Sequence, residues 1–218
     1  MDLIYQNPLR GQRDINDFVL EGKARISFDH DAMMMENELD SELGQKANYV
    51  LWCPAEFPSD LEVRWEFLPL TDQGLCILFM AAGGQGGRDL FDSSLSPRTG
   101  EYRQYHSGDI NAYHVSYFRR KEPDERTFHT CNLRKSYGFH LVAQGGDPIP
   151  EAAECREFYQ MCLRKKDRQI TFLINGLELF HFLDDGSTYG DLLGSGKIGF
   201  RQLAPLKAKY KNLEVYQL

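Results

Sequence analysis

The stretch from residue 101 to residue 140 gathers side chains that can donate and accept hydrogen bonds. It holds four of the six histidines, together with five arginines, five tyrosines and three phenylalanines. Hydroxyl groups on a ligand need donors and acceptors close together, and an arginine can bind a carboxylate through two parallel hydrogen bonds. This combination of residue types is typical of a surface that binds a sugar.

Strand periodicity would divide these side chains between two faces. In residues 111–120 one face would pack and the other would carry polar groups, with Tyr113, Val115 and Tyr117 opposite His114, Ser116 and Arg120. Residues 128–136 alternate in the same way, with Cys131 and Leu133 opposite Thr130, Asn132 and Arg134. Residues 121–126 suit a hairpin connection, so two neighbouring strands would present one polar surface.

We expect the ligand to be an oligosaccharide, and two converging arginines favour a uronic acid over a neutral sugar. The predicted core contacts are His114, Arg120, Asn132 and Arg134, and the second-rank contacts are Ser116, His106 and Arg201. Trp52 or Tyr105 could stack on a sugar ring. The alternative interpretation is a solvated outer sheet face with cross-strand polar pairs.

If the protein is a catalyst, a lyase or a hydrolase is favoured over a transferase. In a lyase, an arginine would neutralise the uronate carboxylate while His114 or a tyrosine removes the adjacent proton. No second acid is placed near these residues by the sequence.

A cluster of three acids lies earlier in the chain, where Glu38, Asp40 and Glu42 have the spacing of one strand face. The pattern is similar to the E-x-D-x-E motif of laminarinase-like glycoside hydrolases, in which two carboxylates act as nucleophile and acid. Ser41 stands where that motif has an apolar residue, and residues 32–37 make a poor strand entry. A solvated loop is the favoured interpretation.

Alternation with a period of two recurs along most of the chain, and turn residues separate the segments. Residues 61–67 place alternate apolar side chains on one face, whereas residues 75–80 are apolar on both faces, as in a central strand. Many short strands at this spacing predict an all-β fold, a two-sheet antiparallel sandwich forming a single domain over residues 1–218.

Asn175-Gly176 predicts a two-residue hairpin turn, because a type I′ turn needs positive φ at both central residues. In the simplest register three cross-strand pairs follow: Ile174 with Leu177, Phe172 with Leu179, and Ile170 with His181.

The overall charge and the apolar runs exclude several classes of partner. A net charge of −7 argues against nucleic acid and against a polybasic membrane anchor. The first residues contain no apolar signal-peptide core, and no apolar run approaches the ~18 residues of a membrane span. We therefore expect a cytoplasmic protein with no membrane partner. The five cysteines lack CxxC spacing and predict buried thiols, and no cofactor or metal site is predicted.

Four segments carry a resemblance to a known family: LWCPAEFP, YHVSYFRR, HTCNLRKSYGFHLVAQGGDPIP and GKIGFRQ. They resemble the YesU-like family of uncharacterised bacterial proteins, from about Ala47 to the last residue. The resemblance implies a concanavalin A-like, galectin-like jelly-roll sandwich of the lectin and glucanase type. It also implies a link to saccharides, since bacterial relatives tend to accompany the use of plant polysaccharides. The galectin pattern of alternate His, Asn and Arg is met only at His114, because Ser116 and Phe118 follow it.

Two functions are therefore expected from the sequence. The first is a carbohydrate-binding or carbohydrate-processing protein with a concave sheet groove. The second is a non-catalytic interaction sandwich that forms a homodimer, which predicts exposed apolar residues such as Phe180 and Phe182 at a symmetric contact.

Overall fold

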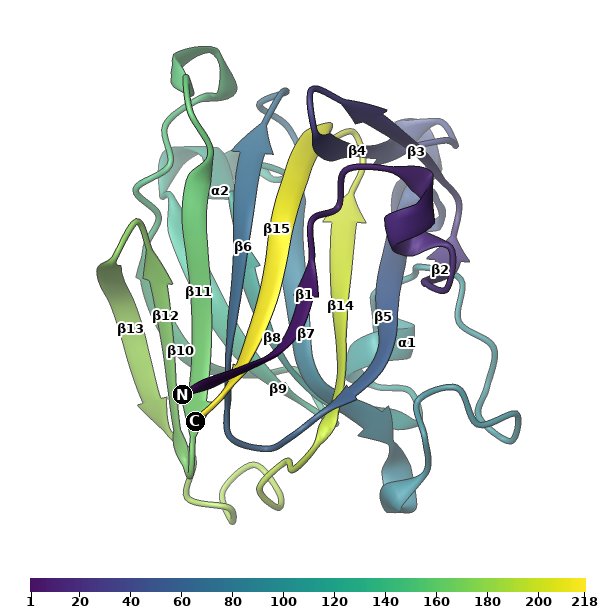
Figure 1. The fold of residues 1–218 in the computed structure, drawn as a ribbon, viewed down its shortest axis with the longest axis vertical. Coiled ribbons are helices and arrows are strands. Elements are labelled where there is room, and N and C mark those ends of the chain that lie inside the picture. The colour runs from purple at the N-terminus through teal and green to yellow at the C-terminus, as the bar shows by residue number, and fades with distance from the viewer.

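The computed structural model describes residues 1–218 and consists of two antiparallel β-sheets stacked face to face (Figure 1). Sheet A has eight strands in the order β13-β12-β11-β6-β15-β4-β3, with β1 also paired to β15. Its strands are β1 (Asp2–Asn7), β3 (Ala24–Asp29), β4 (Ala32–Asn37), β6 (Leu61–Pro69), β11 (Tyr159–Lys166), β12 (Gln169–Ile174), β13 (Leu177–Leu183) and β15 (Ala208–Gln217).

Sheet B has seven strands in the order β10-β9-β8-β7-β14-β5-β2. Its strands are β2 (Val19–Gly22), β5 (Tyr49–Phe57), β7 (Leu75–Gly84), β8 (Ile110–Tyr117), β9 (Thr130–Ser136), β10 (His140–Gly146) and β14 (Gly196–Leu203). Helices are confined to α1 (Arg103–His106), α2 (Pro123–Thr127) and the short 3-10 turns Gln12–Ile15, Ser41–Ala47, Gln85–Gly87 and Ala152–Glu154. The predicted all-β, two-sheet antiparallel sandwich is confirmed. None of the helices is long and apolar enough to cross a membrane.

The main core lies between the sheets and follows the predicted alternation. The inward residues of β6 are all buried in it, as are those of β8 and β9: Leu61, Val63, Trp65, Phe67, Tyr113, Val115, Tyr117, Cys131 and Leu133. Strand β7 lies between β8 and β14 and is buried on both faces, which confirms the central strand expected at residues 75–80.

The Asn175-Gly176 hairpin forms with the predicted turn, since φ is 50° at Asn175 and 78° at Gly176. The pair Ile174–Leu177 is confirmed, but the register then shifts, and Phe172 faces Phe180 instead of Leu179. The shift has a simple cause: Leu179 is an extra residue on β13, so every later pair moves by one position. Ile170 consequently faces Phe182, not His181.

The same shift bears on the expected dimer surface. Phe180 is buried against Phe172, with ring centroids 5.6 Å apart, and Phe182 packs against the main core. The two phenylalanines therefore do not form an exposed apolar patch.

The three acids of residues 38–42 lie outside any strand. Glu38 follows the end of β4, and Asp40 caps the next turn by accepting a hydrogen bond from the backbone of Glu42 at 2.9 Å. All three side chains are exposed, which matches the expected solvated loop.

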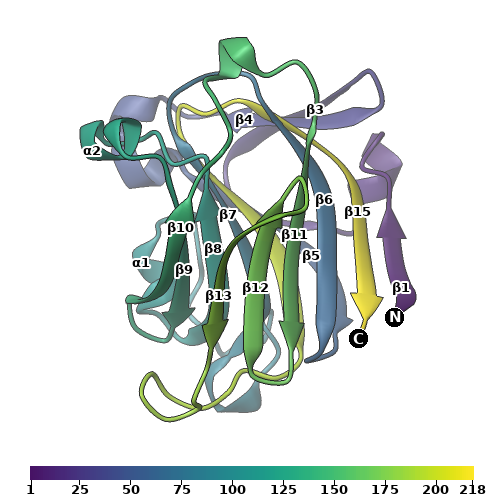
Figure 2. The same ribbon diagram turned by 90° about the vertical axis from the view of Figure 1, so that its left-hand side faces the viewer.

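Residues 85–109, called the covering segment here, connect β7 to β8 and lie over half of the outer face of sheet B. This segment includes α1, which Figure 2 shows on the side of sheet B that faces away from sheet A. It closes a second apolar core with side chains of β5, β7 and β14: Val50, Trp52, Leu75, Ile77, Phe79, Ala82 and Leu203, packed with Leu90, Leu95, Tyr105, Ile110 and Ala112.

A buried ion pair fastens the covering segment to the edge strand β2. Arg98 donates to both carboxylate oxygens of Glu21 at 2.7 to 3.1 Å, and the Tyr105 hydroxyl donates to the same carboxylate at 2.8 Å. Arg98 also donates to the carbonyl of Leu90 at 2.8 Å. Both charged groups are buried, so each depends on the other for its hydrogen bonds.

We predict that Glu21→Ala lowers the free energy of unfolding by about 3 kcal/mol or more, because it leaves the buried Arg98 unpaired. Urea unfolding measures the change, and limited proteolysis should show new cleavage within residues 85–109. The matched control is Arg25→Ala, whose ion pair to Glu36 is exposed and should contribute less than about 1 kcal/mol. Equal effects of the two substitutions would contradict the role given to this ion pair.

Candidate functional site

The outer face of sheet B that the covering segment leaves open contains a small pocket with three arginines. Its volume is about 90 Å³. The polar lining comes from β8, β9, β14, α1 and α2 and their flanks: Tyr102, Ser116, Arg119, Glu125, Asn132, Arg134 and Arg201. The apolar lining is Leu75, Ile77, Phe139 and Leu203. We call this the arginine pocket.

Six of the seven residues predicted from the sequence lie in or beside this pocket. Cross-strand pairing brings them together, since His114 pairs with Arg134 and Ser116 pairs with Asn132. Arg201 comes from β14, two strands away from β8, and His106 comes from α1 in the covering segment.

Arg120 is the predicted contact that lies elsewhere. Strand β8 ends at Tyr117, and Phe118 has a φ of 47°, so the alternation that would place Arg120 beside Ser116 is broken. Arg120 is buried, donates to the carbonyl of Ile149 at 2.8 Å and pairs with Asp147 at 3.4 Å. It stabilises the fold instead of facing the polar surface.

Arg119 takes the place expected of Arg120. It donates to the Thr130 hydroxyl at 2.7 Å and pairs with Glu125 at 2.6 Å. With the Asn132 amide turned to satisfy its neighbours, Asn132 Oδ1 accepts from Arg119 at 3.1 Å. The sequence offers adjacent arginines at 119 and 120, but only the backbone turn at Phe118 decides which one faces outward.

Arg201 is wholly buried at the back of the pocket. One nitrogen, Nη2, donates to the carbonyl of Gly100 at 3.0 Å and to Gln45 Oε1 at 3.2 Å, whereas Nε and Nη1 have no hydrogen-bond partner. The guanidinium lies 4.7 Å from the ring centroid of Tyr102. Burial lowers the pKa of Arg201 to about 10, which still leaves it charged at neutral pH.

Arg134 and Phe139 form the open rim of the pocket. The Arg134 guanidinium lies 3.7 Å from the ring centroid of Phe139 and donates to its carbonyl at 3.1 Å. Phe139 is 49% exposed, and Tyr137 and Leu141 beside it are also exposed. Burial and the nearby Arg119 lower the pKa of Arg134.

The exposed aromatic residues are therefore not those expected from the sequence. Trp52 and Tyr105 are fully buried in the second core, with ring centroids 6.3 Å apart, so they cannot stack on a ligand. Tyr137 and Phe139 lie on the turn between β9 and β10. The sequence Tyr-Gly-Phe, with a turn-forming glycine between two aromatic residues, could have predicted their exposure. Gln144 is also unpredicted, and its amide lies 2.7 Å from that of Asn132.

His114 lies beneath Tyr102 and is fully buried, so it has no access to a ligand. Its Nε2 lies 2.8 Å from the Tyr102 hydroxyl, and its Nδ1 has no partner. Burial, reinforced by Arg134, His106 and Arg201, holds the pKa of His114 well below its usual range. His114 is thus a neutral support for Tyr102, and the proton-removing role expected of it has no route to a substrate.

Tyr102 and His106 form the wall contributed by α1. Burial raises the pKa of Tyr102 to about 12, so the hydroxyl stays protonated at neutral pH. The His106 ring packs 4.6 Å from the centroid of Phe139, and its carbonyl accepts a hydrogen bond from the backbone of Gly138 at 2.7 Å. This bond ties α1 to the turn between β9 and β10.

Comparison with other proteins identifies the family. Residues 2–215 match the family described as "Domain of unknown function (DUF1961)". The chain belongs to this family.

A Bacillus subtilis (strain 168) protein described as "Uncharacterized protein YesU" is 51% identical over 214 residues, covering 98% of this chain and 95% of the relative. The resemblance drawn from the sequence is thereby confirmed. The crystal structure of a Bacillus subtilis protein of unknown function with a galectin-like fold is 50% identical, with a TM-score of 0.96, covering 100% of this chain and 96% of the other.

More distant structures share the fold alone. The metal-free lectin I-B4 from Griffonia simplicifolia has a TM-score of 0.62 at 9% identity, covering 98% of this chain and 99% of the lectin. At this identity the similarity confirms the lectin-type sandwich.

The neutral state of His114 predicts a dependence of stability on pH. The unfolded chain binds a proton at this residue as pH falls through about 6.5, whereas the folded chain resists protonation, so stability is greatest above that pH and decreases below it. Between about pH 7 and about pH 5 the decrease should be shallower in His114→Gln, by at most about 1.4 kcal/mol per pH unit.

Urea unfolding at several pH values measures both slopes. The control is Gln12→Ala, which replaces an exposed, uncharged side chain and should leave the slope unchanged. Parallel curves for the wild type and His114→Gln would show that His114 titrates in the folded protein as it does in water.

Proposed function

We propose that the arginine pocket and the open face beside it bind an oligosaccharide that carries a carboxylate, such as one containing a uronic acid. The observation that carries the proposal is the charge of the pocket. Three guanidinium groups line about 90 Å³, and Glu125 is the one acidic side chain in the lining. The pocket is cationic in a chain whose net charge is −7, which favours an anionic group.

The size of the pocket supports a carboxylate and not a whole sugar ring as its occupant. Sites for complete small molecules usually have volumes of ~300 Å³ or more. A ring attached to the carboxylate would lie outside the pocket, against the exposed part of Phe139 and the Arg134 guanidinium stacked on it. Aromatic faces beside arginine and amide groups suit a sugar, which has apolar C–H faces and polar edges.

The charge of Arg201 adds to this argument. The Arg201 nitrogens are buried, but the charge has no carboxylate partner, so an anion in the pocket beside it would compensate that charge electrostatically. Gln144 is exposed beside the pocket and offers an amide group to the hydroxyls of the ligand, whereas Ser116 and Asn132 line the pocket and are largely buried.

The side chains of the pocket favour binding over bond cleavage. Glycosidases generally need two carboxyl groups flanking the bond that breaks, and Glu125 has no acidic neighbour in the lining. Its carboxylate is also occupied: it pairs with Arg119 and accepts from the backbone of Lys121 at 3.0 Å and of Glu122 at 2.9 Å.

We predict that Arg134→Ala weakens binding of trigalacturonate by about tenfold to a hundredfold, because charge-assisted hydrogen bonds are lost. Isothermal titration calorimetry measures the affinity. Arg134→Lys should recover only part of it, since lysine lacks the planar fork that grips a carboxylate. Arg134 is half-buried, so the melting temperature should fall by only about 2–4 °C.

Two controls make the test specific. Arg25→Ala removes an exposed arginine from sheet A and should bind trigalacturonate as the wild type does. The methyl ester of the same trisaccharide lacks the negative charge and should bind weakly. Equal affinity for the acid and the ester, or an Arg134→Ala variant that binds normally, would refute the proposal.

A further inference from the structure

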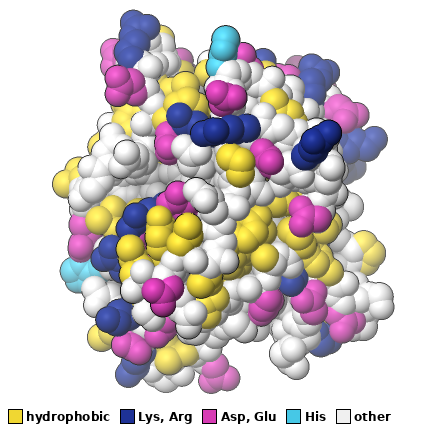
Figure 3. Space-filling view, viewed as in Figure 1, with side chains coloured by type: hydrophobic (Ala, Val, Ile, Leu, Met, Phe, Trp, Pro, Cys, Tyr) yellow, Lys and Arg dark blue, Asp and Glu magenta, His cyan; other side chains and the backbone are white.

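The outer face of sheet A carries a second hollow, on the opposite side of the molecule from the arginine pocket. Its volume is about 420 Å³, and it lies over β6, β11 and β15 near the Asn175-Gly176 turn. Figure 3, viewed from the side of sheet A, shows a depression bordered by both basic and acidic side chains. The size falls within the range of small-molecule sites. We call it the sheet A hollow.

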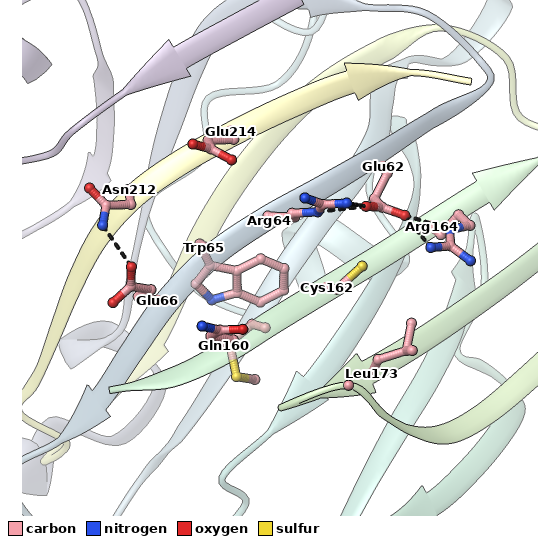
Figure 4. A pocket seen from close by; sticks show the side chains of 12 residues that line it. Glu62, Arg64, Trp65, Glu66, Gln160, Cys162, Arg164, Leu173, Asn212 and Glu214 are labelled. Atoms are coloured by element: carbon pink, nitrogen blue, oxygen red, sulfur yellow. Dashed lines mark hydrogen bonds and ion pairs between the residues drawn. The ribbon is translucent and has the colours of Figure 1, made fainter. Parts of the chain in front are cut away.

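A fixed ion cluster forms one wall of the hollow (Figure 4). Glu62 is 0% exposed, and its two carboxylate oxygens are each held by an arginine: Arg64 Nε donates at 2.6 Å and Arg164 Nε at 2.5 Å. Both guanidiniums also pair with Glu62 through Nη2, which leaves Nη1 of each without a partner. Arg64 and Arg164 are 42% and 45% exposed, so two oriented donors remain available.

The opposite wall is shaped by an irregularity in β15. The register of β15 on β6 shifts between Lys211 and Glu214, and Asn212 within this shift has a φ of 52°. Bulges of this kind re-aim side chains. Here Asn212 Nδ2 donates to Glu66 at 2.6 Å, as Figure 4 shows, and this bond leaves Asn212 Oδ1 as a free acceptor.

Gln160 lies between the two walls and has no side-chain hydrogen bond within the chain. It pairs across the strands with Glu66, and its amide offers one acceptor and two donors to the hollow. Cys162 and Leu173 add an apolar portion to the lining. Burial raises the pKa of Cys162 to about 12, so its thiol is uncharged.

The charges of the lining are nearly balanced, in contrast to the arginine pocket. Arg64 and Arg164 face three carboxylates, which are Glu62, Glu66 and Glu214, and the last accepts from the Tyr216 hydroxyl at 2.6 Å. Glu66 also pairs with Lys211 Nζ at 3.1 Å, so the charges around the hollow cancel and neither an anion nor a cation is favoured there. The hollow offers both free donors and free acceptors, which suits an uncharged ligand with many hydroxyl groups.

We propose that the sheet A hollow binds a neutral sugar unit, through Arg64 Nη1, Arg164 Nη1, the Gln160 amide and Asn212 Oδ1. This site goes beyond the proposed function, because it is separate from the arginine pocket and takes a ligand of different charge. A glycan with neutral and acidic portions could engage both faces of the sandwich.

The test is a titration of ¹⁵N-labelled protein with three neutral trisaccharides, maltotriose, cellotriose and β-1,4-galactotriose, followed by NMR. At least one should shift the backbone amides of β6, β11 and β15 and the Arg64 and Arg164 Nε–H signals, with the amides of β8 and β9 unchanged. Gln160→Ala should weaken that binding by about fivefold to tenfold. Asn212→Gly should weaken it as well, and glycine retains the positive φ. Arg25→Ala is the matched control and should bind normally.

The proposal is overturned if none of the three sugars shifts signals on sheet A. It is also overturned if Gln160→Ala and Asn212→Gly, with unfolding curves like that of the wild type, bind as tightly as the wild type. Arg134→Ala separates the two sites: shifts on sheet A that vanish in this variant would mean that the sugar binds at the arginine pocket and acts on sheet A indirectly.

Discussion

Sheet B has to be buried on both faces along β5, β7 and β14, and this constraint determines where a ligand can bind. Apolar side chains such as Trp52, Ile77 and Phe79 point outward from these strands and require a cover. The covering segment supplies it, and the buried pair of Glu21 and Arg98 fastens it to the edge of the sheet. Because the cover reaches these strands only at the turn between β9 and β10, the arginine pocket beside them stays open.

The covering segment also contributes part of the site that it leaves uncovered. Tyr102 and His106 lie on it, and they form a wall against Arg134 and Phe139 of the opposite rim. The Tyr102 ring packs against the Arg201 guanidinium, and the Tyr102 hydroxyl is hydrogen-bonded to His114. The positions of these groups are therefore coupled to the packing of the second core, so the geometry of the arginine pocket depends on residues that no ligand would touch.

The two outer faces of the sandwich use arginine in opposite ways. On sheet A, Arg64 and Arg164 are paired with a carboxylate that is completely withdrawn from water, so their charge is locally compensated. On sheet B, Arg134 and Arg201 have backbone, amide and aromatic partners but no carboxylate. Removing a charge from water without an opposite charge is costly, and the cost falls when an anion enters. This difference is the physical basis for assigning ligands of different charge to the two faces.

The sequence by itself determined the fold class, the strand alternation and most of the polar surface, because a period of two fixes which side chains share a face of a regular strand. It thus placed His114, Ser116, Asn132 and Arg134 together correctly. The sequence-based placement of side chains was wrong where the backbone departs from regular strand geometry. Phe118 has a left-handed backbone conformation, so Arg119 and not Arg120 faces the polar surface. The extra residue in β13 shifted the hairpin register.

Tertiary packing alone decided which side chains are buried beneath another segment of the chain. Trp52, Tyr105 and His114 are residue types that often bind sugars, yet the covering segment buries all three. The sheet A hollow likewise depends on a bulge in β15 and on contacts among strands distant in sequence. Burial and long-range register arise from the sum of many weak contacts across the whole chain, and local patterns of residues do not encode that sum.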